Sequence, residues 1–391
     1  MSLPKILIVD DEPFNIDYLE QELEESKFIT LAATDGQEAL DQVQAESPDL
    51  ILLDIMMPIM DGFEVLARLK ADPTTRDIPV IIISADNNMH SVVKGIQLGA
   101  EDYLPKPFEP TLLHARISSS LVKKNLRDLQ KLYLKSLERE LEIGRDIQKG
   151  FLPAQLPQVD GWQIAAYFKA AREVSGDFYD AYLLPDGNLM CVVGDVCGKG
   201  VGAALFMTLF RSLIRATSTT EAFSEVQSAG PLTHAERLAQ IISFTNNYVA
   251  TTHYSASMFA TVFIGIIDLS NNTLTYLCCG NEHPVVVSQG GEITTLQTTG
   301  PIVGIIPDAP FPAIEIPFNK NNLLLAFSDG LTDALNPEVE AFGRERLLSI
   351  LKEGDTNPAA LISILEERVH QFIGPADQFD DITVLVVKRD A

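Results

Sequence analysis

The chain has 391 residues, with 29 lysines and arginines against 54 aspartates and glutamates, so its formal net charge at pH 7 is −25. This charge disfavours binding to nucleic acid or to an anionic membrane surface, and it favours protein partners and metal ions where carboxylates converge. A hydrophobic content of 46% over this length predicts two packed domains and a connector rather than a disordered chain.

The four cysteines do not have the spacing of a zinc site. Cys278 and Cys279 fall in the apolar run TYLCCG, which predicts buried free thiols. The first residues, MSLPKILIVDDE, predict a strand followed by acids rather than a signal peptide, and no apolar run reaches about 18 residues. We therefore expect a cytoplasmic protein with no membrane span.

Residues 1–122 alternate short apolar runs with helical patterns. The predicted strands are continuous β-branched runs at residues 5–10, 29–34, 50–55, 79–84 and 101–106. Helices are predicted between them, over residues 15–25, 36–46, 62–71 and 90–100. Continuous apolar strands are typical of sheets covered on both faces, so we predict an α/β doubly wound, five-stranded parallel sheet.

Polar residues stand at the carboxyl ends of these strands, where ligands of such sheets bind. Asp10 and Asp11 end the first strand, and Asp54 ends the third. Three carboxylates this close disfavour one another unless a cation is present, and Mg²⁺ prefers oxygen ligands. Ser84 adds a hydroxyl and Lys106 adds a positive charge. We predict a site that accepts a phosphoryl group on Asp54.

The strings DD, LLDIMMPIMDG, IIISA and YLPKPF occur in this order, and residues 3–122 resemble a response-regulator receiver domain. The resemblance implies that a histidine kinase phosphorylates Asp54. It also implies Mg²⁺ held by Asp11, Asp54 and the carbonyl of Met56, with Asp10 assisting through a water. 

The same resemblance assigns a switch to the receiver. Ser84 and Tyr103 are expected to change position when Asp54 is phosphorylated, and Lys106 is expected to contact the phosphoryl oxygens. The peptide bond before Pro107 is expected to be cis.

Residues 123–152 form a predicted helical linker with the character of a coiled coil. An apolar stripe recurs every three or four residues, at Leu126, Leu129, Tyr133, Leu137 and Leu141. The pattern predicts interruptions at glycines 144 and 150 and an end at the prolines that follow. The stripe either docks on its own domain or pairs with a second copy in a homodimer, and periodicity does not separate these alternatives.

Residues 153–391 change character, because strands now dominate. They are predicted over residues 163–170, 189–196, 259–269, 273–280, 285–289, 322–329 and 382–388. Helices are predicted over residues 200–217, 234–253, 343–353 and 358–373. Hairpin signals occur at residues 268–276 and 288–296, and residues 218–231 are predicted to be a loop. Runs of strands with clustered helices predict an α+β layered domain.

Four aspartates of this region flank strands or turns, in SGD, GDV, SDG and DDI: Asp177, Asp195, Asp329 and Asp380. A single aspartate in a turn usually caps local backbone, but four beside apolar strands indicate a shared site. Converging carboxylates need metal to offset their repulsion, and all-oxygen ligands suit two Mg²⁺ or Mn²⁺ ions. Two such ions can bind a phosphoryl oxygen and ionise a water.

Residues 145–388 resemble the PPM-type protein phosphatases of the stage II sporulation branch, through EVSGDFYD, GDVCGKGVGAAL, FSDGLTDALNP and FDDITV. The resemblance implies a β-sandwich flanked by helices. It implies that Asp195 bridges two ions, that Asp177 and the Val196 carbonyl complete one site, and that Asp329 and Asp380 complete the other. Asp381 neighbours that second site and is an alternative ligand.

Taken together, these resemblances imply a response regulator whose phosphorylation at Asp54 controls a metal-dependent protein serine/threonine phosphatase. Its expected substrate is a phosphoserine on a STAS-type anti-anti-sigma partner. The competing hypothesis is a non-catalytic adaptor that binds a sigma factor or another regulator through a phosphatase-like fold. The complete ligand set favours the enzyme.

Overall fold

The computed structural model describes residues 3–24, 27–86, 88–220, 232–353 and 357–390. The chain divides into two compact units, Met1–Leu137 and Glu138–Ala391, each of which is described by itself. The division falls inside the linker expected from the sequence. The domain boundaries at residues 122 and 152 stay predictions.

The first unit holds a five-stranded sheet in the order β2-β1-β3-β4-β5, and every pair in it is parallel. Its strands are β1 (Lys5–Val9), β2 (Ile29–Ala33), β3 (Leu50–Leu53), β4 (Val80–Ser84) and β5 (Asp102–Pro105). The expected strands and their order of connection are confirmed.

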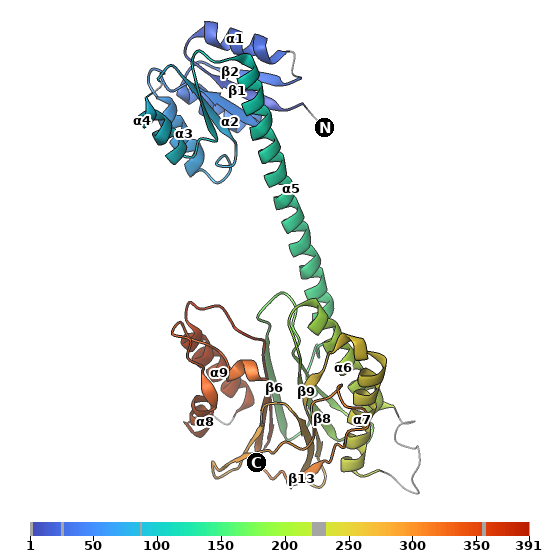
Figure 1. The fold of residues 1–391 in the computed structure, drawn as a ribbon. Coiled ribbons are helices and arrows are strands. Elements are labelled where there is room, and N and C mark those ends of the chain that lie inside the picture. The colour runs from blue at the N-terminus through green and yellow to red at the C-terminus, as the bar shows by residue number, and fades with distance from the viewer. Residues whose placement is uncertain (1–2, 25–26, 87, 221–231, 354–356, 391) are drawn as a thin grey trace. The chain divides into compact units, whose positions relative to one another are not determined.

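Helices cover both faces of this sheet (Figure 1). They are α1 (Pro13–Glu24), α2 (Gly36–Glu46), α3 (Gly62–Ala71), α4 (Met89–Gln97) and α5 (Pro110–Lys149). Alternate strand residues point to opposite faces, so Ile6 and Ile8 pack with α1 and α5, while Leu7 and Val9 pack with α2 and α3. This two-sided burial explains why the strands are apolar throughout.

Helix α5 is continuous from Pro110 to Lys149, and Gly144 does not interrupt it as the sequence predicted. A single glycine costs a helix only about 1 kcal/mol, which the flanking turns offset. The helix ends at Lys149, directly before Gly150, where the sequence predicted an interruption, rather than at the prolines that follow. The stripe residues Leu126, Leu129 and Tyr133 are exposed.

The second unit is a sandwich of two five-stranded antiparallel sheets, ordered β13-β10-β9-β8-β7 and β12-β11-β14-β15-β6. The first sheet contains β7 (Phe178–Leu183), β8 (Leu189–Val196), β9 (Ala260–Asp268), β10 (Thr273–Cys279) and β13 (Ile314–Pro317). The second contains β6 (Trp162–Lys169), β11 (Val285–Val287), β12 (Ile293–Thr295), β14 (Leu323–Phe327) and β15 (Ile382–Arg389). Side chains such as Val193 and Leu385 fill the space between the sheets.

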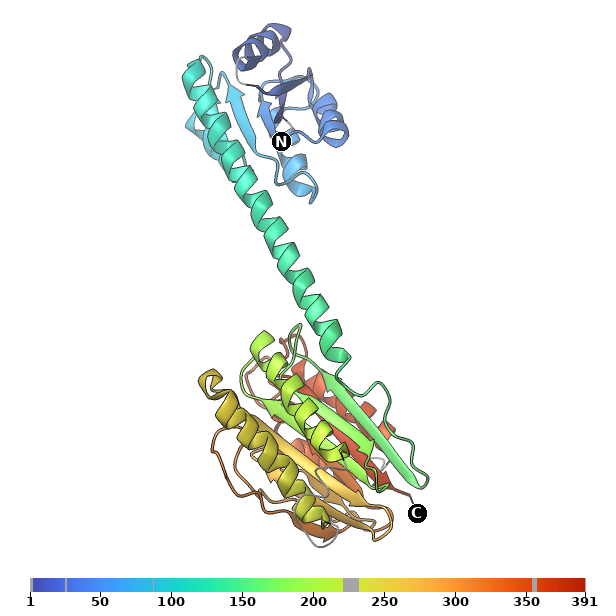
Figure 2. The ribbon, with the colours of Figure 1, turned by 90° about the vertical axis from the view of Figure 1, so that its right-hand side faces the viewer.

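A pair of helices covers the outer face of each sheet, which confirms the layered fold (Figure 1). The pairs are α6 (Val201–Thr219) with α7 (His234–Thr252), and α8 (Gly343–Glu353) with α9 (Pro358–Ile373). Figure 2 shows α6 and α7 side by side over their strands. Phe210 of α6 and Ile242 of α7 lie in the core against the first sheet.

The sequence analysis missed two strands, β7 and β13. Strand β7 contains Asp180, which is 1% exposed and is paired with Arg211 and Arg215 of α6 at 2.8 Å each. These ion pairs with a distant helix allow a charged residue inside a buried strand. The local sequence does not predict them, so the strand was not expected. Strand β13 is short and lies at the sheet edge. 

The loop expected after residue 217 and the burial of the two adjacent cysteines can both be compared with the structure. Residues 218 and 219 of the predicted loop continue α6, and residues 221–231 lie outside the described residues. Cys278 and Cys279 are buried free thiols, as expected. Within the described ranges, no helix has the length and apolar character needed to cross a membrane.

Candidate functional site

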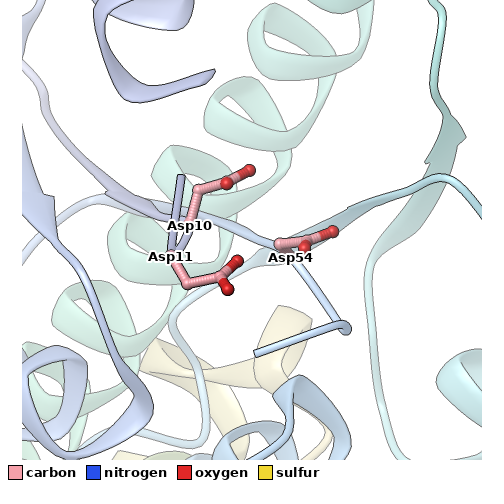
Figure 3. Close-up of side chains that lie close together, drawn as sticks. All are labelled: Asp10, Asp11 and Asp54. Carbon is pink, nitrogen blue, oxygen red and sulfur yellow. The ribbon is translucent and has the colours of Figure 1, made fainter. Parts of the chain in front are cut away.

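The first acidic site lies at the carboxyl ends of β1 and β3. These strands pair in parallel with Val9 opposite Leu53, so Asp10 and Asp11 come next to Asp54. Their carboxylate oxygens lie within 4.8 Å of one another, and Figure 3 shows the three side chains next to each other. Asp10 is 2% exposed and Asp54 is 6% exposed. The structure thus brings together the three expected carboxylates.

Lys106 supplies the positive charge of this site. Its Nζ lies 2.6 Å from Asp10 Oδ2 and 3.4 Å from Asp54 Oδ1. The pKa of Asp54 lies above its ordinary value, because burial and the charge of Asp10 raise it by more than Lys106 lowers it. Asp54 Oδ1 is buried and accepts no hydrogen bond from the described residues. A buried carboxylate oxygen without a hydrogen-bond donor is suited to bind a cation, so the residues present here fit Mg²⁺.

A glycine shapes the loop after Asp54. A Cβ at Gly62 would lie 2.1 Å from the Asp54 carbonyl oxygen, so only glycine lets α3 begin this close to Asp54. Gly62 N also donates to Ile55 O at 3.0 Å. Met56 lies in this loop with its side chain exposed. The sequence analysis did not single out Gly62, although the string MDGF contained the signal.

The expected switch residues lie at the ends of β4 and in β5. Ser84 is fully buried, and its Oγ accepts a hydrogen bond from Asp86 N at 3.2 Å. Tyr103 OH donates to the carbonyl of the same Asp86. Both side chains therefore contact one loop residue. The Lys106–Pro107 peptide bond is cis, as expected.

The second acidic site gathers at one end of the sandwich. Asp177 immediately precedes β7, and Asp195 lies near the end of β8, where Phe178 opposite Gly194 makes them neighbours. Asp329 begins a 3-10 turn after β14, and Asp380 lies two residues before β15, which pairs with β14. Contacts of β15 with β7 and β8 join the two halves of the site.

The carboxyl groups of this second site perturb one another. Burial and the charge of Asp195 raise the pKa of Asp177, which is 2% exposed. Burial and the charge of Asp329 raise the pKa of Asp195 to about 7. Burial and the charge of Asp380 raise the pKa of Asp329. Three carboxyl groups that all resist ionisation together mark a place where positive charge is needed.

A second glycine faces the Asp195 strand end. A Cβ at Gly176 would lie 2.7 Å from the Val196 carbonyl oxygen and 3.5 Å from Asp195 Oδ1. The missing side chain leaves room at the carbonyl that the family resemblance assigns as a ligand. Together with the all-carboxylate donor set, this room fits hard divalent ions.

The two acidic sites differ in how closely their ligands are packed. Among the described residues, the first site is the one in which three potential ligand atoms all lie within 4.8 Å. The carboxylates of the second set do not meet this criterion among the described residues, so they are spread more widely.

Asp381 holds a loop together. Its Oδ1 accepts from Ala171 N at 2.7 Å, and its Oδ2 accepts from Ser175 Oγ at 2.7 Å and from Gly176 N at 2.9 Å. Both oxygens are thus engaged by the segment that leads into Asp177. Thr383, which the sequence analysis missed, donates from Oγ1 to Asp177 Oδ2 at 2.6 Å.

The end of α5 contacts the same segment. Gln148 Nε2 donates to Ser175 O at 2.6 Å, and Ser175 N donates to Gln148 Oε1 at 3.0 Å. Gln148 is 7% exposed, so these two bonds are shielded from water. A chain of hydrogen bonds therefore runs from α5 through Ser175 to Asp381 and Asp177.

A family model described as stage II sporulation protein E (SpoIIE) matches residues 185–390, more than half of the chain. The chain belongs to the SpoIIE family of PPM-type phosphatases. A second model, the response regulator receiver domain, matches residues 6–118, and the first unit has that domain's fold. Both resemblances expected from the sequence are confirmed.

Individual relatives agree with this assignment. Protein IcfG of Synechocystis sp. is 40% identical over 263 residues, which are 64% of this chain and 42% of IcfG. Response regulator PleD of Caulobacter vibrioides is 44% identical over 115 residues, which are 29% of this chain and 25% of PleD. The chain thus spans less than half the length of these two curated relatives.

A solved structure shares the fold of the second unit. The SiaA-PP2C domain of Pseudomonas aeruginosa aligns over 99% of its own length and 66% of this chain, with a TM-score of 0.55 and 22% identity. At this identity the likeness concerns the fold alone.

Proposed function

We propose that this chain is a response regulator in which phosphorylation of Asp54 controls a metal-dependent protein serine/threonine phosphatase. The observation that carries the proposal is the meeting of Asp177, Asp195 and Asp329, with mutually raised pKa values, at one end of a SpoIIE-family sandwich. Carboxyl groups whose pKa values are raised by one another favour divalent cations as partners.

In the hydrolytic site, Asp177, Asp195 and the Val196 carbonyl would hold one divalent ion, and Asp195, Asp329 and Asp380 would hold a second. PPM-type phosphatases generally depend on Mg²⁺ or Mn²⁺, and such ions would lower the pKa of a bound water and neutralise phosphoryl oxygens. Asp381 keeps the Asp177 loop in place through its bonds to Ala171 N and Gly176 N. This role is distinct from the ligand role that the sequence left open.

In the receiver, a histidine kinase is the proposed phosphoryl donor and Asp54 the acceptor. Asp11, Asp54 and the Met56 carbonyl would hold Mg²⁺, and Asp10 would assist through a water. The buried Asp54 Oδ1 without a hydrogen-bond donor supports this assignment. Lys106, already 3.4 Å from that oxygen, neutralises the incoming phosphoryl group, while Ser84 and Tyr103 adjust the loop at Asp86.

The proposed substrate is a phosphoserine on a STAS-type anti-anti-sigma protein, which rests on the SpoIIE-family membership. The accessibility of the site supports a protein substrate, since the Asp380 side chain is 33% exposed. The net charge of −25 argues against nucleic acid as a partner.

Helix α5 is the proposed connection between the two activities. Phosphorylation of Asp54 reorients or dimerises this helix and thereby assembles the metal site through Gln148 and Ser175. The exposed stripe at Leu126, Leu129 and Tyr133 supports pairing with a second copy of the chain, because its spacing is that of a coiled coil. Light scattering of the full chain, with and without phosphodonor, measures the dimer.

The test is hydrolysis of p-nitrophenyl phosphate and of a phosphoserine protein by the full chain with Mn²⁺. We expect activity that Asp195→Ala abolishes and that a small phosphodonor alters in the wild type but not in Asp54→Ala. Absence of hydrolysis with both Mg²⁺ and Mn²⁺, or activity indifferent to Asp195→Ala, would refute the catalytic proposal and favour the adaptor.

A further inference from the structure

The carboxylates of the second site meet one positively charged side chain. Among the ion pairs of the described residues, one involves a carboxylate of this site, and it joins Lys199 to Asp380. The other carboxylates of the site are Asp177, Asp195, Asp329 and Asp381. Lys199 Nζ lies 3.0 Å from Asp380 Oδ2 and 2.9 Å from the carbonyl oxygen of Phe379. The ammonium group also lies over the Phe379 ring, 4.5 Å from its centroid.

The local backbone places Lys199 at this point. It stands in the connection between β8 and α6, between Gly198 at φ 90° and Gly200 at φ 79°. A Cβ at either glycine would meet nothing within 4 Å, so neither glycine is there for lack of space. Left-handed backbone on both sides of the lysine is what requires them. The sequence thus uses two glycines to fold this short connection back toward Asp380.

The start of the connection is fixed to β9. Cys197 N donates to Phe259 O at 2.9 Å, and Phe259 N donates to Cys197 Sγ at 3.3 Å. Lys199 therefore begins from an anchored backbone, while its side chain remains 37% exposed at the mouth of the site. An anchored backbone with a long mobile side chain suits a group that must meet an incoming ligand.

A phosphate monoester dianion approaching this mouth meets carboxylates, which repel it. Divalent ions offset the negative charge of the carboxylates that bind them. A phosphoryl group has three terminal oxygens, so it also needs hydrogen-bond donors from the protein. Lysine binds phosphate as a point charge with three donors. If Asp380 were engaged by a divalent ion, the ammonium group of Lys199 would lose its carboxylate partner at 3.0 Å and would be free to bind a phosphoryl oxygen.

We propose that Lys199 binds the phosphoryl group of the phosphoserine substrate, exchanging its contact with Asp380 for one with a phosphoryl oxygen. This inference rests on the proposed phosphatase function and names the chain's own group for the phosphate. It assigns Lys199 to substrate binding rather than to the metal ligands.

The experiment compares the full-length wild type with Lys199→Met and Lys199→Arg. Lys320→Met is the matched control, because it removes an exposed lysine near the start of β14, at the opposite end of that strand from Asp329. Calorimetry measures the binding of inorganic phosphate to the Mn²⁺-loaded protein, and a separate titration measures Mn²⁺ affinity. Kinetics with a phosphoserine peptide give kcat and KM.

We expect Lys199→Met to weaken phosphate binding about tenfold and to raise KM by a similar factor, with Mn²⁺ affinity unchanged or higher. Lys199→Arg restores most of the phosphate affinity, and Lys320→Met matches the wild type. Unchanged phosphate affinity and KM in Lys199→Met would overturn the proposal. A weaker Mn²⁺ affinity with unchanged KM would overturn it too, because Lys199 would then merely position Asp380.

Failure of the phosphatase proposal gives a different result. A wild type that hydrolyses nothing refutes the enzyme, yet calorimetry still compares phosphate binding by wild type and Lys199→Met. Equal binding in that case rejects the role of Lys199 as well.

Discussion

The two acidic sites of this chain hold the same components in different settings. Each combines carboxylates from strand ends with one lysine, at 2.6 Å from Lys106 to Asp10 and at 3.0 Å from Lys199 to Asp380. In the receiver the lysine is 21% exposed and its main partner 2% exposed, whereas in the phosphatase the values are 37% and 33%. The first site suits a small phosphoryl group, and the second is open enough for a protein.

The sites also differ in how they are assembled. The receiver carboxylates come from two adjacent parallel strands. The carboxylates of the phosphatase come from the ends of strands in two different sheets. The loop before Asp177 is held by hydrogen bonds from Ser175 Oγ and Gly176 N to Asp381, and Thr383 Oγ1 donates to Asp177 itself. A site assembled from distant segments responds to small movements of any one segment, which makes it the better point for regulation.

Paired glycine substitutions provide the largest expected effect and separate the sites. Gly62→Ala places a Cβ 2.1 Å from the Asp54 carbonyl oxygen, and Gly176→Ala places one 2.7 Å from the Val196 carbonyl oxygen. Contacts this short force backbone to move. We expect Gly62→Ala to abolish phosphoryl uptake from radiolabelled acetyl phosphate, and Gly176→Ala to lower Mn²⁺-dependent hydrolysis by about 100-fold or more.

Each variant serves as the control for the other, since we expect Gly176→Ala to keep phosphoryl uptake and Gly62→Ala to keep the hydrolysis that the wild type shows without phosphodonor. Gly202→Ala in α6 is a further control, because a Cβ there meets nothing within 4 Å. Normal hydrolysis in Gly176→Ala would show that the Val196 carbonyl does not need its present position.

The sequence predicted the receiver site better than the phosphatase site for a physical reason. In a parallel sheet the carboxyl ends of the strands share one edge, so Asp10, Asp54 and Lys106 were expected to meet from their positions in the strands alone. All the receiver strands were also expected, and the clearest of them are β1, β3 and β4, which are buried on both faces and almost uniformly apolar.

The phosphatase site depended on pairing that no local pattern reveals. Asp177 meets Asp195 because β7 pairs with β8, and the remaining carboxylates come close because β15, which pairs with β14 and β6, packs against β7 and β8 of the other sheet. Strand β7 was missed because Asp180 within it needs arginines of α6 to be tolerated. Lys199 was unremarkable in the sequence, since a lysine between glycines usually marks a solvated turn.

The contact of Gln148 with Ser175 tests whether the distant assembly of the phosphatase site transmits regulation. Gln148→Ala removes both hydrogen bonds and leaves the Ser175 N–H and C=O without these partners. We expect the Mn²⁺ concentration for half-maximal hydrolysis to rise about tenfold and the response to phosphodonor to shrink. Titration of Mn²⁺ with and without acetyl phosphate measures both.

Lys149→Ala is the matched control, because that neighbouring side chain is exposed and makes only a 3.9 Å ion pair with Asp146 among the described residues. Both variants shorten a side chain at the same end of α5. If Lys149→Ala and Gln148→Ala changed the Mn²⁺ requirement equally, the effect would belong to helix stability rather than to the bonds with Ser175.

The smallest expected effect concerns the segment of α5 that follows its buried residues Leu113, Ile117 and Leu121, where ion pairs connect the helix to the receiver. Glu101 accepts from Lys123 at 2.9 Å and from Arg127 at 3.0 Å. Although burial acts to raise it, these hydrogen bonds hold the pKa of Glu101 below its ordinary 4.5. A carboxylate with a lowered pKa stabilises the fold above its unfolded pKa, and the contribution is lost as pH falls through the folded value.

Glu101→Gln removes this contribution, so residues 123–131 should exchange amide hydrogens several-fold faster in the variant than in the wild type at pH 7. Exposed and partly exposed pairs contribute about 0.2–1 kcal/mol each, which corresponds to such a change. As the pH is lowered through the folded pKa, which lies below 4.5, the difference should shrink, because Glu101 of the wild type then takes up a proton. Hydrogen exchange of both proteins at the same pH, followed by mass spectrometry, cancels the intrinsic pH dependence of the exchange. A difference that persisted undiminished at low pH would mean that packing, and not charge, attaches this part of α5 to the receiver, in contrast to the hydrogen-bonded attachment through Gln148 at its other end.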